Sequence, residues 1–153
     1  MMTARERILQ RWTETFLSRY PIRPVVEIVE YIEEATSKIL DGVLKLYSGN
    51  VEVNIDEALD DLMRFLATDR NLTPGESIKL IANLKHIIAE EMGLSEKDSL
   101  RLFNIMDKIL YKAFDFYMAC REEIFNLRLK EKERDLEIMR RVIEFAEKTD
   151  FKF

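Results

Sequence analysis

Apolar residues recur at steps of three and four along most of the chain, which is the spacing of one face of an α-helix. Five periodic segments can be separated, at about residues 3–20, 24–48, 54–70, 73–92 and 95–148. The connector at 50–53 alternates briefly between apolar and polar residues, but it is too short to found a sheet. The pattern predicts an all-α helical bundle of about five principal helices with a long C-terminal helix. A globin-like arrangement is one form that such a bundle can take.

Residues that favour helix N-termini stand before four of these segments. Thr3 followed by Glu6 is the pattern of a capping box, in which each side chain accepts a hydrogen bond from the other residue's backbone N–H. Thr73 opens a second pattern of this kind, with a proline directly behind it. We expect Asn54 and Ser95 to cap the third and fifth helices.

Helix-stopping residues are confined to the first two thirds of the chain. Pro21 should end the first helix near residue 20, and Pro24 suits the first turn of the second. Gly49 and Gly93 are expected to close the second and fourth helices in the left-handed conformation. Because no glycine or proline follows Gly93, the fifth helix should continue to about Lys148.

The first segment carries the chain's single tryptophan on its apolar stripe. Ile8, Leu9 and Phe16 lie on the same helical face as Trp12. A side chain of this size stabilises a fold most when it is removed from water. We therefore expect Trp12 to be largely buried.

The first half of the last segment is rich in large apolar residues, and we expect it to belong to the core. Its apolar positions are Leu100, Leu102, Phe103, Ile105, Met106, Ile109, Leu110, Phe114, Phe116, Tyr117 and Met118.

The second half of the last segment has a different pattern. Its apolar residues follow alternating steps of three and four once Lys132 is counted as a polar position, which is a short heptad repeat. We divide the chain into a helical sensor-like domain at 1–128 and a charged, heptad-patterned tail at 129–153. The tail should pair two copies of the chain or, alternatively, fold back on its own bundle. The expected interface consists of Phe125, Leu129, Leu136, Met139 and Ile143.

Composition excludes several classes of function. The formal net charge of −5 argues against binding to nucleic acid, which needs clustered Lys and Arg to replace phosphate counterions. There is no run of about twenty apolar residues and no apolar stretch of signal-peptide length at the start, so we expect a cytoplasmic protein without a membrane span. The single cysteine agrees with a reducing compartment.

Residues that could perform chemistry are scarce. His86 and Glu90 share a helix face at the spacing of two metal ligands, but a di-iron bundle needs a second Glu and His pair that this chain lacks. His86 or Cys120 could in principle ligate a haem, although no motif supports it. The simpler interpretations are a rim histidine and a small buried cysteine. We therefore expect a protein that is not an enzyme and holds no metal or resident cofactor.

Several stretches resemble the RsbRD-type N-terminal domain, which precedes the STAS domain of some RsbT co-antagonist proteins and the kinase domain of some sensor histidine kinases. They span about residues 5 to 130 and lie at 6–12, 56–62, 70–77, 84–85 and 113–124. The last of these reads Ala-Phe-Asp-Phe-Tyr-Met-Ala-Cys-Arg-Glu-Glu-Ile.

This resemblance implies a helical input domain, similar in role to the globin-like non-haem sensor domains of RsbR proteins, that dimerises and passes a signal along its C-terminal helix. No STAS domain follows in this sequence, so we expect the output to pass to a separate protein partner. The resulting hypothesis is a non-catalytic sensor or regulatory module of a bacterial signalling or stress-response pathway.

Two alternatives stay open. One is a small-ligand or haem-like cofactor-binding protein, favoured by the aromatic residues of the last helix and by His86 and Cys120. The other is a structural adaptor that recruits a partner helix through the apolar positions of its tail.

Overall fold

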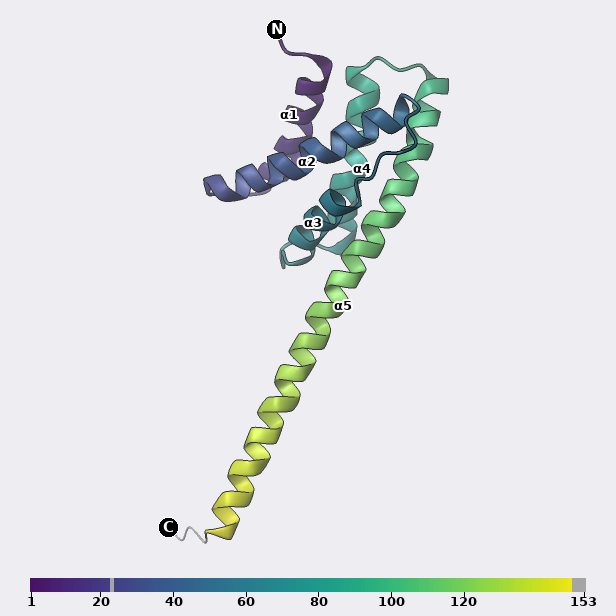
Figure 1. Cartoon of the computed structure of the whole chain (residues 1–153). Coiled ribbons are helices and arrows are strands. Elements are labelled where there is room, and N and C mark those ends of the chain that lie inside the picture. Colours follow the sequence, from purple (N-terminus) through teal and green to yellow (C-terminus); the bar gives the residue numbers. More distant parts are fainter. Residues whose placement is uncertain (23, 150–153) are drawn as a thin grey trace. The chain divides into compact units, whose positions relative to one another are not determined.

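The computed structural model describes residues 1–22 and 24–149 and contains five helices (Figure 1). These are α1 (Ala4–Leu17), α2 (Val26–Tyr47), α3 (Asp56–Ala67), α4 (Pro74–Glu91) and α5 (Glu96–Lys148). The described residues contain no strand, which confirms the predicted all-α bundle with a long C-terminal helix. Within the described ranges, no helix is both long enough and apolar enough to cross a membrane.

The chain divides into two compact units, Met1–Met118 and Ala119–Phe153. The first contains α1 to α4 and the first part of α5, and the second is described as far as Thr149. The expected division at 128/129 stays a prediction, and the last four residues of the expected tail lie outside the described residues.

Three of the predicted helix starts are confirmed by hydrogen bonds. Thr3 and Thr73 each form a complete capping box with the glutamate three residues later, whose backbone N–H donates to the threonine hydroxyl at 3.2 and 3.1 Å. The Ser95 hydroxyl accepts a hydrogen bond from the Asp98 backbone at 3.2 Å. These bonds satisfy N–H groups that have no partner within the helix.

The start of α3 differs from the prediction. Ile55, not Asn54, is the N-cap residue, and it supplies no side-chain cap. The Asn54 side chain accepts a hydrogen bond from the Asp56 backbone at 2.9 Å, which closes a short turn in front of the helix. Asparagine competes for nearby backbone donors in this way, so the residue that turns the chain can precede the N-cap by one position.

The predicted ends of α2 and α4 are confirmed, whereas α1 is shorter than expected. Gly49 and Gly93 have φ values of 99° and 58°, the left-handed conformation that glycine adopts without a steric penalty. Helix α1 ends at Leu17, and the Tyr20 backbone donates to the Leu17 carbonyl in a turn at 3.2 Å. The three residues before Pro21 therefore form a turn rather than more helix.

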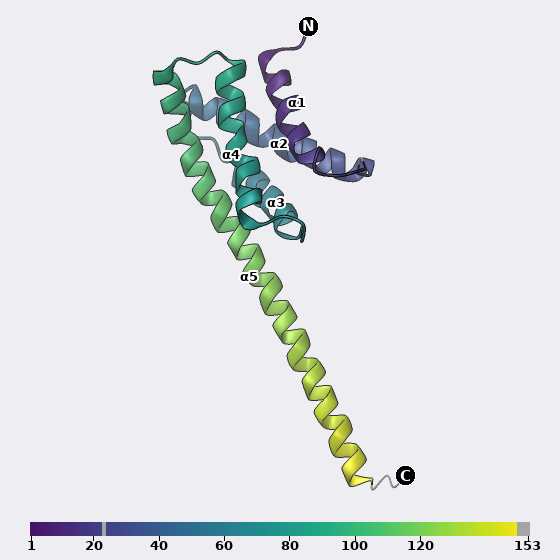
Figure 2. The same cartoon turned by 180° about the vertical axis from the view of Figure 1, so that it is seen from behind.

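Helix α1 packs against α4 and α2 in the first unit (Figure 2), and the Trp12 side chain of α1 takes part in the contact with α4. Trp12 is fully buried, as predicted. Its indole Nε1 donates a hydrogen bond to the Leu80 carbonyl oxygen at 2.8 Å, and its ring meets Phe16 edge-on at 5.7 Å. The hydrogen bond matters because a buried indole N–H without an acceptor would destabilise the fold.

Helices α2 and α3 pack side by side, and the first part of α5 is tied to the same unit. The Arg101 guanidinium donates to the Tyr47 carbonyl oxygen at 2.6 Å and lies 4.0 Å from the centre of the Tyr47 ring. Lys112 forms an ion pair with Asp56 at 3.1 Å. Five side chains of this part of α5 are buried, namely Leu102, Met106, Ile109, Ala113 and Tyr117.

The prediction that the whole apolar first half of α5 lies in the core is wrong for three residues. Leu100, Phe114 and Met118 are exposed, together with Tyr111. With 3.6 residues per turn, only one face of this helix can point to the core, and these four residues lie on the opposite face. We call them the α5 patch.

Candidate functional site

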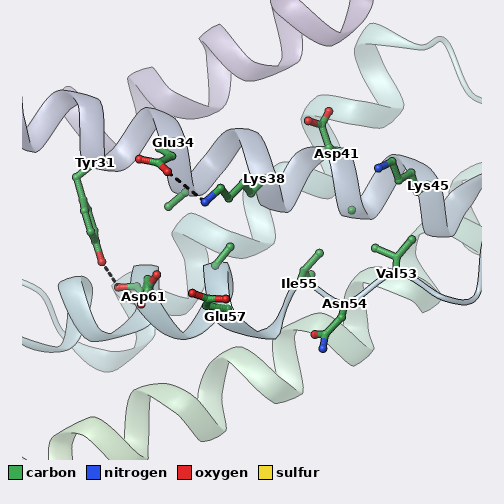
Figure 3. A pocket seen from close by; sticks show the side chains of 13 residues that line it. Tyr31, Glu34, Lys38, Asp41, Lys45, Val53, Asn54, Ile55, Glu57 and Asp61 are labelled. Atoms are coloured by element: carbon green, nitrogen blue, oxygen red, sulfur yellow. Dashed lines mark hydrogen bonds and ion pairs between the residues drawn. The ribbon is translucent and has the colours of Figure 1, made fainter.

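A cleft of about 420 Å³ lies between α2 and α3, and most of the side chains that line it are polar or charged (Figure 3). Helix α2 contributes one wall, and the connector 53–55 together with α3 contributes the other. The volume lies within the range of small-molecule sites. The polar and charged side chains along the cleft are Tyr31, Glu34, Lys38, Asp41, Lys45, Asn54, Glu57 and Asp61.

The floor of this cleft depends on Gly42 in the middle of α2. A Cβ atom at Gly42 would overlap the Ile55 side chain and would lie 3.3 Å from Val53. The connector can therefore approach α2 this closely only because residue 42 has no side chain.

Many of the charges in the cleft are held by ion pairs. Asp41 binds Arg5 through two hydrogen bonds, of 2.6 and 3.0 Å. These bonds lower the pKa of Asp41 below its usual value of 3.8. Lys38 and Glu34 are 3.1 Å apart. Arg5 and Asp41 are 38% and 45% exposed, so solvent limits the stabilisation from this pair to about 1 kcal/mol at most.

Tyr31 lies at one end of the cleft (Figure 3). Its hydroxyl donates to the Asp61 carbonyl oxygen at 2.9 Å, and its ring contacts Phe65. Partial burial, together with the negative charges of Asp61 and Asp60, raises the pKa of Tyr31 above its usual value. Among the described residues that line this cleft there is no serine, cysteine or histidine.

A second cleft, of about 280 Å³, lies between the first part of α5 on one side and the end of α2, the connector 50–55 and the start of α3 on the other. Its lining is mainly aliphatic and also includes Lys108 and the ion pair between Lys112 and Asp56. An apolar cavity with a few polar groups is the usual form of a small-ligand site. Its apolar members are Leu46, Val51, Val53, Ile55, Ile105 and Ile109.

The two residues considered for cofactor binding line neither cleft. His86 is exposed and meets the Phe103 ring edge-on at 5.6 Å. The carboxylate of Glu90, the residue that shares its face, is 2.8 Å from Arg11. Cys120 is buried, as the sequence suggested. In the part of the chain that the structure describes, no group of three or more His, Cys, Asp or Glu residues is placed to hold a metal ion.

All five residues of the expected interface are exposed on the second unit. We call them the seam, and their exposed fractions range from 46% for Leu129 to 66% for Leu136. Large side chains exposed to this extent along one line of a helix mark a surface suited to association. The complete set is Phe125, Leu129, Leu136, Met139 and Ile143.

A second line of exposed apolar residues on this unit was missed by the sequence analysis. It lies on another side of the helix from the seam. Phe145, for example, follows Leu136 by about two and a half turns at 3.6 residues per turn, and the remaining half turn places it on the opposite side. Its members are separated by steps of eleven, four and three residues, which are helical spacings and can be read from the sequence. The sequence analysis considered only the heptad pattern, which selects the seam. We call this line the outer stripe, and it consists of Leu127, Ile138, Val142 and Phe145.

The chain is similar to an uncharacterized protein of Archaeoglobus fulgidus, with 47% identity over 145 residues. The match covers 95% of this chain and 95% of that protein. No family model matches the chain, and no match was found among solved structures.

Replacing Gly42 with alanine tests the close approach at the floor of the α2–α3 cleft. We expect Gly42→Ala to lower the free energy of unfolding by about 1–3 kcal/mol, because overpacking displaces the connector. This loss should exceed the gain that alanine normally brings inside a helix. Urea titration followed by circular dichroism measures the difference.

Gly75→Ala is the matched control. A Cβ atom at Gly75 would meet only the Thr73 hydroxyl, at 3.9 Å. We expect this variant to be as stable as the wild type or slightly more stable. A Gly42→Ala variant that is as stable as Gly75→Ala would show that α2 and the connector do not approach one another in this way.

Proposed function

The chain belongs to the same family as the uncharacterized protein of Archaeoglobus fulgidus, and on that premise we propose that it is a non-catalytic, dimeric regulatory module of a signalling or stress-response pathway. The match leaves only about eight residues of the chain unaligned, so the relative contains a counterpart of most of the C-terminal unit as well as of the helical domain. A proposal for this family must therefore give a role to both units.

The observation that carries the proposal is the exposure of the seam. Its five side chains leave a line of apolar surface in water, and covering that line with a second copy would remove the unfavourable hydration of this surface. Heptad spacing is what allows two helices to keep such a line in contact. The seam therefore favours a homodimer.

Pairing through the seam alone would be weak. Lys132 interrupts the apolar positions, and the tail offers fewer heptads than a stable isolated coiled coil usually needs. The helical domain must then supply part of the contact. The α5 patch is the apolar surface of that domain best suited to this role, because Tyr111, Phe114 and Met118 are exposed at heptad spacing.

The outer stripe provides a place for the output partner. Leu127 and Ile138 remain accessible when the seam is covered, because they lie on a different side of the helix from the seam. An apolar helix face of this kind typically binds in a groove of another protein. Dimerisation through the seam and partner binding through the outer stripe agree with the role of RsbRD-type input domains, which the sequence resembles. Such an arrangement would pass a signal without any catalytic residue.

Sedimentation of two matched double variants tests the proposal. We expect the wild type to be a dimer and Leu136→Glu with Ile143→Glu to be a monomer of unchanged helicity, because charges in the seam oppose pairing. Leu127→Glu with Ile138→Glu alters the outer stripe by the same chemistry and should remain a dimer. A wild type that is monomeric at all accessible concentrations, or a dimer unaffected by the seam variant, would contradict the proposal.

A small-ligand function is the second candidate, and the aliphatic cleft beside Lys108 and Lys112 favours it. Lys112 is already paired with Asp56, so Lys108 is the cation of this cleft to which a ligand anion would bind. Apolar walls beside Lys108 fit a molecule that combines a hydrocarbon chain with a negative charge. A medium-chain carboxylate has this chemistry.

Octanoate is a suitable probe of this cleft. If it binds, millimolar octanoate should raise the Tm of the wild type through mass action, and Lys108→Glu should reduce the shift. Octan-1-ol has the same chain without the charge and should raise the Tm less. Equal shifts with both molecules, or a shift that Lys108→Glu does not change, would rule out a specific carboxylate site.

A further inference from the structure

The charges beside the seam complement one another between two copies that run in the same direction, an inference that rests on the proposed dimer. The heptad register follows from the seam itself. Leu129, Leu136 and Ile143 occupy position a, and Phe125, Lys132 and Met139 occupy position d. The charged residues that flank this core at positions g and e are Arg128, Glu133, Asp135 and Arg140.

In a parallel pair of helices, each position g lies beside the position e five residues later on the other copy. Arg128 would then face Glu133 of the second copy, and Asp135 would face its Arg140. Both pairs join opposite charges, and the symmetry of the dimer doubles each of them. We propose that two copies pair in parallel and in register through the seam, with these charge pairs setting the orientation.

The antiparallel arrangement places position g beside position g and position e beside position e. When the whole seam overlaps in this direction, Asp135 lies beside Asp135 of the second copy and Glu133 beside its Glu133, and these like charges repel. Charges at these positions are what commonly determine partner choice and orientation in paired helices. The occupant that fits the seam is therefore a second copy of this chain in the parallel direction.

Arg128 and Glu133 form the more informative of the two pairs. Arg140 already binds Glu137 at 2.6 Å and Glu144 at 2.9 Å within its own helix, so its pairing with Asp135 of the second copy would compete with local contacts. Lys132 opposes the pairing, since the two ammonium groups lie at the same level in a parallel dimer. Its long stem lets the charge reach water at the edge of the interface.

Charge reversal at Arg128 and Glu133 tests the orientation by sedimentation equilibrium at low salt. We expect Arg128→Glu and Glu133→Arg each to raise the dimer dissociation constant about fivefold, because each replaces two attractive pairs with two repulsive ones. Combining the two reversals in one chain restores attraction in the parallel dimer and should return the constant to near the wild-type value.

Arg134→Glu and Glu131→Arg are the matched controls. They make the same changes at positions f and c, which point away from the seam, and should leave the dissociation constant near the wild-type value. The parallel orientation would be overturned if reversal at Arg128 or Glu133 raised the dissociation constant no more than these controls do. It would also be overturned if the double reversal did not return the constant to near the wild-type value. Either result would leave the proposed dimerisation itself intact. A monomeric wild type would overturn both.

Cross-linking gives a readout that does not depend on charge. In a Cys120→Ser background, Leu136→Cys places two thiols at the same level of a parallel, in-register pair, within the distance that a disulfide spans. We expect a disulfide-linked dimer on mild oxidation. Failure to cross-link under conditions where sedimentation shows a dimer would exclude this register.

Discussion

The structure depends on one constraint, which is that a helix with an apolar face is stable in water only where another element covers that face. In the first unit this cover is complete around Trp12, whose ring is fully buried and whose N–H is bonded to the Leu80 carbonyl oxygen. Helices α1, α2, α3 and α4 meet one another around this core, so each helix covers the apolar face of another. The charged residues then remain at solvent-accessible positions, where Arg5 pairs with Asp41 and Lys38 pairs with Glu34 at modest energy.

The same constraint applies to the C-terminal unit, whose apolar side chains need cover from another chain. A single helix cannot cover its own side chains, and both the seam and the outer stripe are exposed. Association with other chains is the ordinary way to resolve this, and the two lines of residues on different sides allow two kinds of partner. A homodimer through the seam and a separate protein on the outer stripe would together form a simple route from an input domain to an output. The clefts of the first unit provide places where a signal molecule could act.

Much of the fold could be predicted from the sequence because the deciding interactions are local. Capping boxes at Thr3 and Thr73, the left-handed glycines and the burial of Trp12 all follow from spacing within a few residues. Prediction failed where the outcome depends on packing between distant segments. Periodicity alone could not decide which side of α5 faces the core, so Phe114 was misplaced, and neither cleft could be foreseen because each joins residues far apart in the chain. The outer stripe could have been predicted from its helical spacing, but the sequence analysis followed the heptad pattern and predicted only the seam.

Hydrogen–deuterium exchange at several protein concentrations tests the central claim, that a second copy covers the seam. Exposed helical amides exchange readily unless association protects them. We predict that protection of residues 125–143 rises with protein concentration, whereas protection of the α1 amides around Trp12 stays constant. Rapid exchange of 125–143 at every concentration would contradict the account, and so would protection that is the same at all concentrations, since the seam would then be covered within one chain.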